Sequence, residues 1–369
     1  MREEECRTSD LDRRMAPLGG SDRDLKWIRP DQPPLRLAGF PWHGQDGVFR
    51  RLPVEPSREI PPAVDRLAEC TAGGQVGFRS DSTHVAVRVE LSGRADMNHM
   101  AATGQCGFDL YVGEPPDQRF HNVSKYDHRE SSYEALLFEH PEGRMRQFTL
   151  NFPLYQGVQR LRVGLTPEAR IEPPRPWAGA GRTVVYGTSI TQGGCASRPG
   201  MAYTNILSRA LNVEIVNLGF SGNGRGEPEV IEVLAGVPDP ELFVLDYEAN
   251  SGGHEKYSRT LPAAVDILRG HHPAVPILVL SRIAYAAELT HEDRREARER
   301  NRAMQAELVE MRRRDGDRNV HFFDGSALLG RDFDECTVDG AHPTDLGFMR
   351  MARGLEPTFR QILTSTGSP

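Results

Sequence analysis

The spacing of apolar residues changes part-way along the chain. From about residue 45 to residue 166, apolar and polar residues mostly alternate, in runs such as HVAVRVEL, GFDLYVGE and RQFTLNF. A period of two is typical of strands that bury one face, and Gly, Pro, Asp and Asn separate the runs. No convincing amphipathic helix interrupts them. This pattern predicts an all-β sandwich or jelly roll.

Beyond residue 182, short apolar runs alternate with segments of helical spacing. The runs are TVVYG, VEIVNLGF, ELFVLDYE, VPILVLSRI and VHFFDG. Five such strands predict a parallel, doubly wound, flavodoxin-like sheet with helices on both faces. Ligand sites of such sheets lie on the loops that leave the carboxyl ends of the strands.

These two patterns divide the chain into four predicted parts. Residues 1–44 are polar, charged and proline-bearing, which predicts an irregular arm. Residues 45–166 form the predicted sandwich domain, and residues 167–182 form a linker rich in Pro, Gly and Ala. Residues 183–369 form the predicted α/β domain. A length of 369 residues agrees with two folded domains.

Charge and cysteine content narrow the classes of function. The formal net charge of −7 offers no basic surface for nucleic acid or for an anionic membrane. The charged start lacks the apolar core of a signal peptide, and no run is long enough for a membrane-spanning helix. Five widely spaced cysteines, an odd number, fit free thiols in a reducing compartment. We therefore expect a cytoplasmic protein; the sequence indicates no oligomeric state.

Ser189 follows the first predicted strand of the α/β domain, in VYGTSITQGG. This is not the nucleophile elbow of the α/β-hydrolases, because Thr191 stands where their second glycine would be. A serine in a turn after a strand is most often structural. A nucleophile at this position would need a base, an orienting acid and oxyanion donors from elsewhere in the chain.

Three later loops contain such groups. In VDGAHPTDLGF, Asp339 and His342 stand three residues apart before the last helix. A neutral imidazole can take a serine proton while a carboxylate on its other nitrogen fixes the tautomer. Gly222 and Asn250 follow the second and third strands, where a backbone N–H and an amide can hold an oxyanion. Each motif alone is more often a turn, but together they favour a serine acyl-transfer site.

The order and spacing of these residues resemble the SGNH, or GDSL-like, hydrolases over residues 183 to 363. The resemblance implies that Ser189 is the nucleophile, with Asp339 and His342 as its partners. It also implies that Gly222, Asn250 and the N–H of the serine hold the oxyanion. DYEAN departs from the usual Gly-x-Asn-Asp block, and a threonine replaces the aspartate of Gly-Asp-Ser-Leu.

A second resemblance covers the front half of the chain. GFDLYVG, at 107–113, is similar to the Gly-x-Asp-Leu-Tyr signature of a β-sandwich domain that precedes this branch of SGNH enzymes. In the nearby run RADMNHM, Asp96, Asn98 and His99 are candidates to line a substrate cleft, against the alternative of a capped loop.

The resemblance implies acyl transfer without a metal or a resident cofactor, and the sequence contains no cysteine–histidine cluster. The layout looks like that of a GDSL-type acyltransferase of polyketide tailoring. We therefore expect an acyl or aryl-acyl group to move from a coenzyme A thioester to a sugar hydroxyl of a glycosylated polyketide. The partners are then a small acyl donor and a hydroxyl acceptor. A carbohydrate acetylesterase or short-chain esterase is the alternative, and an inert carbohydrate-binding protein is less favoured.

Overall fold

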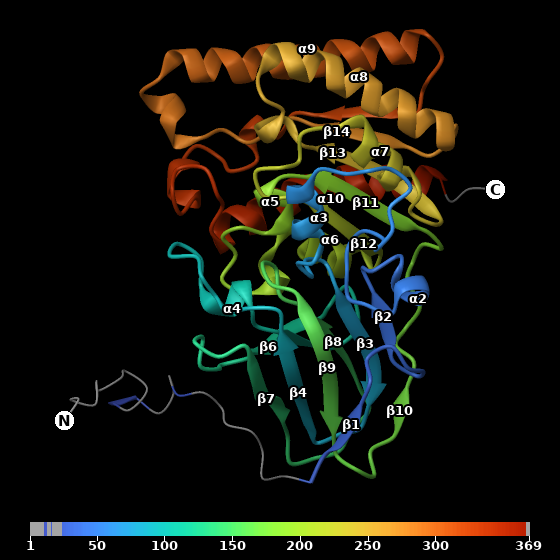
Figure 1. Ribbon diagram of the computed structural model, residues 1–369, viewed down its shortest axis with the longest axis vertical. Helices are drawn as coiled ribbons and strands as arrows, with labels where there is room; N and C mark the ends of the chain where they lie inside the picture. Colours follow the sequence, from blue (N-terminus) through green and yellow to red (C-terminus); the bar gives the residue numbers. More distant parts are fainter. Residues whose placement is uncertain (1–10, 13–15, 17–23, 367–369) are drawn as a thin grey trace.

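The computed structural model describes residues 11–12, 16 and 24–366. An antiparallel β portion and an α/β portion are stacked along the long axis of the molecule (Figure 1). Part of the arm predicted for residues 1–44, including Cys6, lies outside the described residues. Within the described residues, no helix is both long and apolar enough to cross a membrane.

The β portion is a sandwich of two antiparallel sheets, as predicted. The first sheet contains, in spatial order, β1 (Lys26–Ile28), β9 (Val158–Leu165), β4 (His84–Leu91) and β7 (Ser132–Glu139). The second contains β10 (Ile171–Glu172), β3 (Gln75–Ser80), β8 (Arg146–Asn151), β5 (Asp109–Val112) and β6 (Arg119–Val123), with β2 (Arg36–Ala38) also paired to β3. Alternate residues of both sheets, such as Val87 and Phe148, form one buried core.

Two predicted irregular segments contribute strands to this sandwich, so those predictions need correction. β1 and β2 lie within the predicted arm, and β10 lies within the predicted linker at 167–182. Each pairs antiparallel with a strand of the sandwich. These strands have only two or three residues, too few to show a period of two in the sequence.

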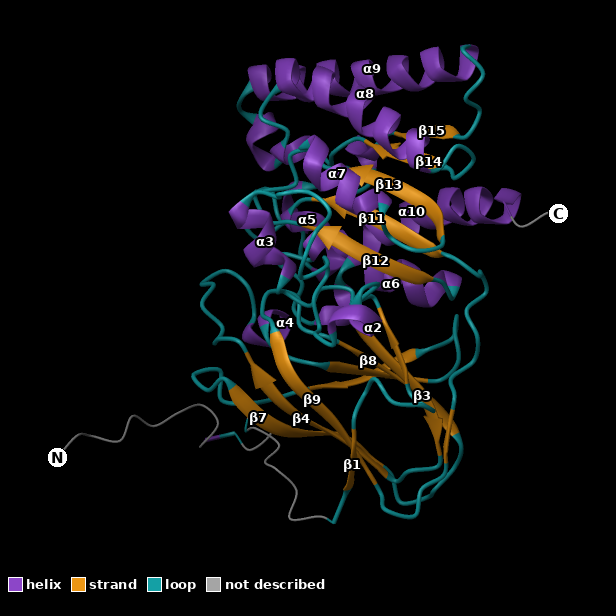
Figure 2. Ribbon diagram, turned by 45° about the vertical axis from the view of Figure 1, so that its right-hand side comes forward, coloured by secondary structure: helices purple, strands orange, loops and turns teal. Residues whose placement is uncertain are grey.

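The α/β portion has the predicted parallel, doubly wound sheet. Its strands, in spatial order, are β12 (Glu214–Gly219), β11 (Arg182–Gly187), β13 (Pro240–Asp246), β14 (Ile277–Leu280) and β15 (Val320–Phe323). One face packs against α6 (Tyr203–Leu211) and α10 (Asp345–Thr366). The other packs against α7 (Pro228–Ala235), α8 (His254–His271) and α9 (Glu292–Arg314), as Figure 2 shows. The strand order is that of flavodoxin-like folds.

Residues 50–68 lie within the segment predicted as sandwich but pack on the α/β portion. They include α3 (Pro62–Ala68), a helix that the alternating pattern did not predict. The two other helices of the front half, α2 (His43–Asp46) and α4 (Ala102–Gln105), are single turns. Val64 of α3 belongs to the core on the α7–α9 face. Arg51 is fully buried and donates hydrogen bonds to the carbonyl oxygens of Gly219 and Cys70. The front half of the chain thus supports the carboxyl end of β12.

Candidate active site

Ser189 is the first residue of α5 (Ser189–Gln192), a short helix that follows β11. Thr188 caps this helix: its Oγ1 accepts a hydrogen bond from the N–H of Ile190, and its own N–H donates to Thr191 Oγ1. Threonine and aspartate both serve as N-caps, so the missing aspartate of the Gly-Asp-Ser-Leu pattern leaves the turn intact. Ser189 is 9% exposed, and its Oγ lies 2.8 Å from His342 Nε2.

His342 and Asp339 lie in the loop before α10 and form the next part of the site. His342 Nδ1 lies 2.7 Å from Asp339 Oδ2, and the His342 N–H donates to Asp339 Oδ1 at 2.8 Å. Burial raises the pKa of Asp339, but these hydrogen bonds and one from the Ala341 N–H outweigh burial and hold it below its usual value. An ionised carboxylate here places the imidazole proton on Nδ1 and leaves the Nε2 lone pair facing the serine.

Gly222 and Asn250 lie on the two loops that flank the Ser189 loop. β12 and β13 are the neighbours of β11 in the sheet, and Gly187, the last residue of β11, is paired with the last residue of each neighbour. Gly222 follows β12 by three residues. Asn250 ends η2 (Glu248–Asn250), the turn after β13. The fold therefore brings both residues to the same edge of the sheet as Ser189.

The potential oxyanion donors are unoccupied. Gly222 has a φ of 68°, a left-handed conformation that favours glycine. Neither its N–H nor that of Ser189 donates a hydrogen bond to the described part of the chain. The Oδ1 atom of Asn250, the acceptor of its amide, is buried and lacks a partner among the described residues. Asn250 itself is half-buried.

Two further sequence predictions concern residues near the site. Of the three candidates in the RADMNHM loop, the structure brings His99 to the dyad: its Nε2 lies 3.9 Å from Asp339 Oδ2, and its ring packs edge-on against that of His342. Asp96 instead donates its backbone N–H to Gln105. Cys195, one of the five cysteines expected to be free thiols, is free and buried, and burial together with the Asp339 carboxylate raises the pKa of its thiol to about 11.

Asp246 accepts hydrogen bonds that stabilise α5, the short helix that begins at Ser189. Its Oδ2 accepts hydrogen bonds from Thr191 Oγ1 at 2.8 Å and from the Tyr203 hydroxyl at 2.7 Å. Thr191 also accepts from the N–H of Thr188, so this carboxylate supports the cap that orients α5. Burial raises the pKa of Asp246 to about 7, despite the two hydrogen bonds that lower it.

We expect Asp246→Asn to stabilise the protein more at high pH than at low pH. The pKa of Asp246 is higher in the folded protein than in the unfolded chain, so the wild type takes up a proton on folding between about pH 4 and pH 7. Its free energy of unfolding therefore falls as pH rises through this range. Asparagine has no charge to bury and can still accept both hydrogen bonds. The gain in unfolding free energy should grow by about 2 kcal/mol between about pH 5.5 and pH 8. Urea unfolding at both pH values tests this, with the exposed Asp293→Asn as control.

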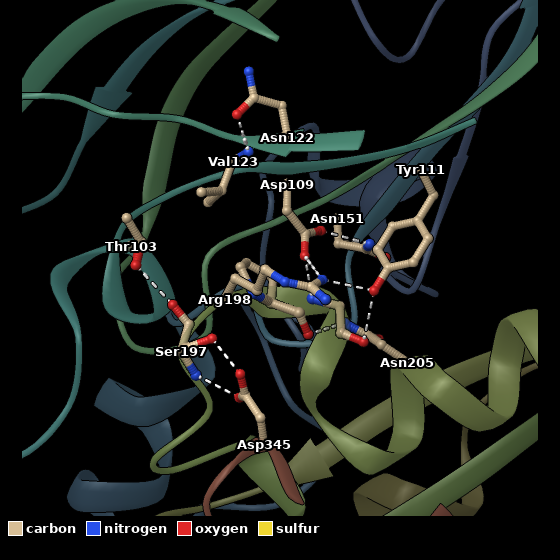
Figure 3. A network of polar contacts seen from close by, with 12 residues as sticks. Thr103, Asp109, Tyr111, Asn122, Val123, Asn151, Ser197, Arg198, Asn205 and Asp345 are labelled. Atoms are coloured by element: carbon tan, nitrogen blue, oxygen red, sulfur yellow. Dashed lines mark hydrogen bonds and ion pairs between the residues drawn. The ribbon is translucent and has the colours of Figure 1, made fainter. Parts of the chain in front are cut away.

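The sandwich is joined to the loop after the nucleophile through a buried ion pair (Figure 3). Asp109, the aspartate of the GFDLYVG motif, is fully buried and accepts hydrogen bonds from Arg198 at 3.0 Å and from the Gly200 N–H at 2.8 Å. Asn151 of β8 donates to its other oxygen at 2.7 Å. The Arg198 guanidinium also donates to the Tyr111 hydroxyl at 2.6 Å.

The same loop also forms hydrogen bonds with residues that directly follow His342 in the chain. The N–H of Ser197 donates to Asp345 Oδ1 at 2.9 Å, and the N–H of Cys195 donates to the carbonyl oxygen of Pro343. Thr103 of α4 holds the Ser197 carbonyl at 2.7 Å (Figure 3). Residues 193–201 therefore connect the sandwich to the backbone directly after the histidine.

Comparisons with known proteins agree with this geometry. The profile of the GDSL-like lipase/acylhydrolase family matches residues 181–360, and that of the GxDLY domain, the N-terminus of SGNH hydrolase-type esterases, matches residues 25–171. A crystal structure of a GDSL-like lipase from Bacteroides ovatus is 31% identical, covers 92% of this chain and 98% of its own, and has a TM-score of 0.84. The chain belongs to the GDSL-like lipase/acylhydrolase family. It is an enzyme of the SGNH/GDSL type, an acyltransferase or an esterase, as the sequence predicted.

Two more distant structures share the fold of this GDSL-like enzyme. The salicylyl-acyltransferase SsfX3 of a tetracycline biosynthetic pathway is 21% identical, with a TM-score of 0.73, and covers 94% of this chain and 99% of its own. A family two carbohydrate esterase from Cellvibrio japonicus is 16% identical, with a TM-score of 0.57, and covers 92% and 98% of the two chains. No curated protein sequence gives a significant match.

Sequence reasoning missed several residues that shape the site of this GDSL-like enzyme. Asp246 lies near the end of the predicted strand ELFVLDYE, at the edge where the candidates gather, so its position was a usable signal. Arg198 and Asp109 pair across 89 positions of the chain, and no local pattern indicates such a pair. Asp109 belongs to the GFDLYVG motif, whereas Arg198 lies four residues beyond the end of VYGTSITQGG.

Proposed function

We propose that the protein cleaves carboxylic esters through an acyl-enzyme on Ser189. The observation that carries this proposal is the continuous relay from Ser189 Oγ through His342 to Asp339, with contacts of 2.8 and 2.7 Å. Such a relay lets a neutral imidazole take the serine proton as the oxygen attacks a carbonyl.

Acylation follows from the protonation state of the relay. Ser189 Oγ bonds to the carbonyl carbon, and its proton passes to His342 Nε2. The imidazolium that forms is stabilised by the Asp339 carboxylate. When the tetrahedral intermediate collapses, His342 gives this proton to the departing alkoxide or thiolate. Water then attacks the serine ester by the same steps and releases the carboxylic acid.

The negative oxygen of the intermediate is held by the Ser189 and Gly222 N–H groups and by the Asn250 amide. The two backbone N–H groups donate no hydrogen bond within the described residues, so they need not break an existing bond to bind the oxyanion. Donors already in place cost no reorganisation when the charge develops.

Replacement of Asn250 with alanine should lower kcat about 10²–10³-fold, because one oxyanion donor is lost in the transition state. The measurement is the steady-state kinetics of p-nitrophenyl acetate hydrolysis. KM should change far less than kcat, since the amide binds an oxygen that is charged only in the transition state. Asn223→Ala, in the neighbouring loop, is the matched control. An unchanged kcat in Asn250→Ala would remove this residue from the site.

The exposure of the dyad favours water as the acceptor. The side chains of His342 and Asp339 are 28% and 36% exposed, so water reaches the base. An acyl-enzyme in such a site hydrolyses readily, because transfer to another acceptor requires that water be excluded.

Transfer of an acyl or aryl-acyl group to a sugar hydroxyl, as expected from the sequence, is the second candidate function. It is favoured by the fold similarity to the salicylyl-acyltransferase, which extends over 94% of this chain. A coenzyme A thioester would then be the donor and a glycosylated polyketide the acceptor.

Intact-mass analysis tests both candidates. The protein is mixed with acetylated sugars, p-nitrophenyl esters, and acyl- and aryl-CoA thioesters, and any adduct is located by peptide mapping and then chased with water or a glycosylated acceptor. Hydrolysis predicts an acetyl adduct on Ser189 that water removes. An adduct that is stable in water but leaves on the sugar acceptor would establish transfer instead. Absence of any adduct on Ser189 with every donor would overturn both.

A further inference from the structure

His99 completes a group of three metal-binding side chains with Asp339 and His342. One ligand atom from each lies within 4.8 Å of the other two. The closest approaches are 2.7 Å between His342 Nδ1 and Asp339 Oδ2, and 3.9 Å between His99 Nε2 and the same oxygen. The three ligands come from two parts of the fold, so the sequence alone shows no ligand spacing.

The loop that presents His99 is firmly held. Gln105, which is 2% exposed, accepts hydrogen bonds from the N–H groups of Asp96 and Met97 at 3.0 Å and donates to the Met100 carbonyl oxygen at 2.7 Å. Met100 is buried in the core of the α/β portion. The backbone that carries His99 is therefore held by residues on both sides of it in the chain.

The donor set selects a class of metal. Two imidazole nitrogens and one carboxylate oxygen suit Zn²⁺ or Co²⁺, whereas Mg²⁺ and Ca²⁺ prefer oxygen ligands only. A tetrahedral zinc ion with bonds of about 2.0–2.1 Å places its ligand atoms roughly 3.3 Å apart. The observed separations of 2.7 and 3.9 Å lie on either side of this value. All three side chains are partly exposed, which leaves a path for the ion and a fourth position for water.

We propose that His99, Asp339 and His342 bind one zinc-class ion and that its binding turns the enzyme off. The ion binds Nδ1 of His342, and the proton that this nitrogen carried moves through solvent to Nε2, so the ring stays a neutral imidazole. The Asp339 carboxylate then binds the ion instead of the imidazole. With its proton on Nε2, the ring has no free lone pair facing Ser189 and no longer accepts the serine proton. Metal binding stands independently of the proposed function, whereas inhibition rests on it.

Binding is tested by calorimetric titration of the EDTA-treated full-length protein with Zn²⁺, and by the visible absorption of Co²⁺. The wild type should bind one ion. His99→Asn and Asp339→Asn should each weaken binding about tenfold or more, because each removes a ligand. His128→Asn, which changes an exposed histidine of the β6–β7 loop, should bind like the wild type. Absence of binding to the wild type, or equal binding by His99→Asn, would overturn the site.

An activity measurement tests the second half of the proposal. Zn²⁺ should inhibit ester hydrolysis by the wild type at concentrations near the measured Kd, and EDTA should restore the rate. His99→Asn, compared with its own metal-free activity, should need about tenfold more Zn²⁺ for half-inhibition. Equal sensitivity of the two proteins would refute inhibition through His99. If no ester is hydrolysed even without metal, the proposed function fails, and the binding titration still decides whether the site exists.

Discussion

Replacement of Ser189 with alanine is expected to lower kcat/KM for p-nitrophenyl acetate on the order of 10⁴-fold or more. The serine oxygen is the only atom in the relay that can form the acyl bond, and His342 Nε2, 2.8 Å away, has no other proton to take in its place. The residual rate would come from the oxyanion donors, which alanine leaves intact. Initial rates of nitrophenolate release, corrected for spontaneous hydrolysis, give the ratio.

A matched variant separates this effect from damage to the loop. Ser221 lies in the neighbouring Gly222 loop, and within the described residues its side chain makes no hydrogen bond to His342. Ser221→Ala should therefore keep the rate within a few-fold of the wild type. If Ser189→Ala is as active as Ser221→Ala, Ser189 is not the nucleophile, and the relay has another purpose.

The sequence was most informative where topology converts chain order into proximity. Ser189 and His342 are separated by 153 positions, and no local pattern connects them. The alternation of strands and helices nevertheless predicts a parallel sheet, and the carboxyl ends of parallel strands lie along one edge. A serine, a glycine and an asparagine after three successive strands are therefore predicted to be neighbours before any contact is known.

Periodicity was less informative about which surface a segment covers. Apolar residues such as Val64 show that one face is buried, but the sequence does not say against what. The structure shows that the segment containing α3 packs on the α/β core although its flanking strands belong to the sandwich. β1 and β10 were missed for a different reason, because strands of two or three residues are below the length at which alternation can be recognised.

Buried charges were the least predictable feature. Asp109 would be expected at the surface on composition alone, since ionised side chains are almost never fully buried unless they are paired. Its partner Arg198 belongs to the other half of the chain, and only the folded structure shows the pair. His99 approaches the dyad in the same way, from a loop of the sandwich.

Contacts from the sandwich support the loops of the candidate active site. Thr103 and Asp109 hold the loop at 193–201, and that loop in turn holds Pro343 and Asp345, directly after the candidate base. Tyr155, in the β8–β9 loop, donates a hydrogen bond to the Ser189 carbonyl oxygen from the other side. Both halves of the chain therefore hold the loops that carry Ser189 and His342.

Arg198→Met should accordingly lower the free energy of unfolding by about 3–5 kcal/mol. Burial already raises the pKa of Asp109, and Arg198 opposes that effect. Without the guanidinium, the carboxylate must either stay charged with only the Asn151 and Gly200 donors or take up a proton, and both cost stability. Urea unfolding at neutral pH, followed by fluorescence and circular dichroism, measures the loss.

Two variants make the Arg198 prediction specific to a buried charge. Arg160→Met removes an exposed ion pair with Glu90, in which the two side chains are 72% and 47% exposed, and should cost less than about 1 kcal/mol. The double variant Asp109→Asn/Arg198→Met should recover part of the loss, since no charge then remains buried. If Arg198→Met costs no more than Arg160→Met, the pair does not join the two halves, and the sandwich supports the site through its other contacts alone.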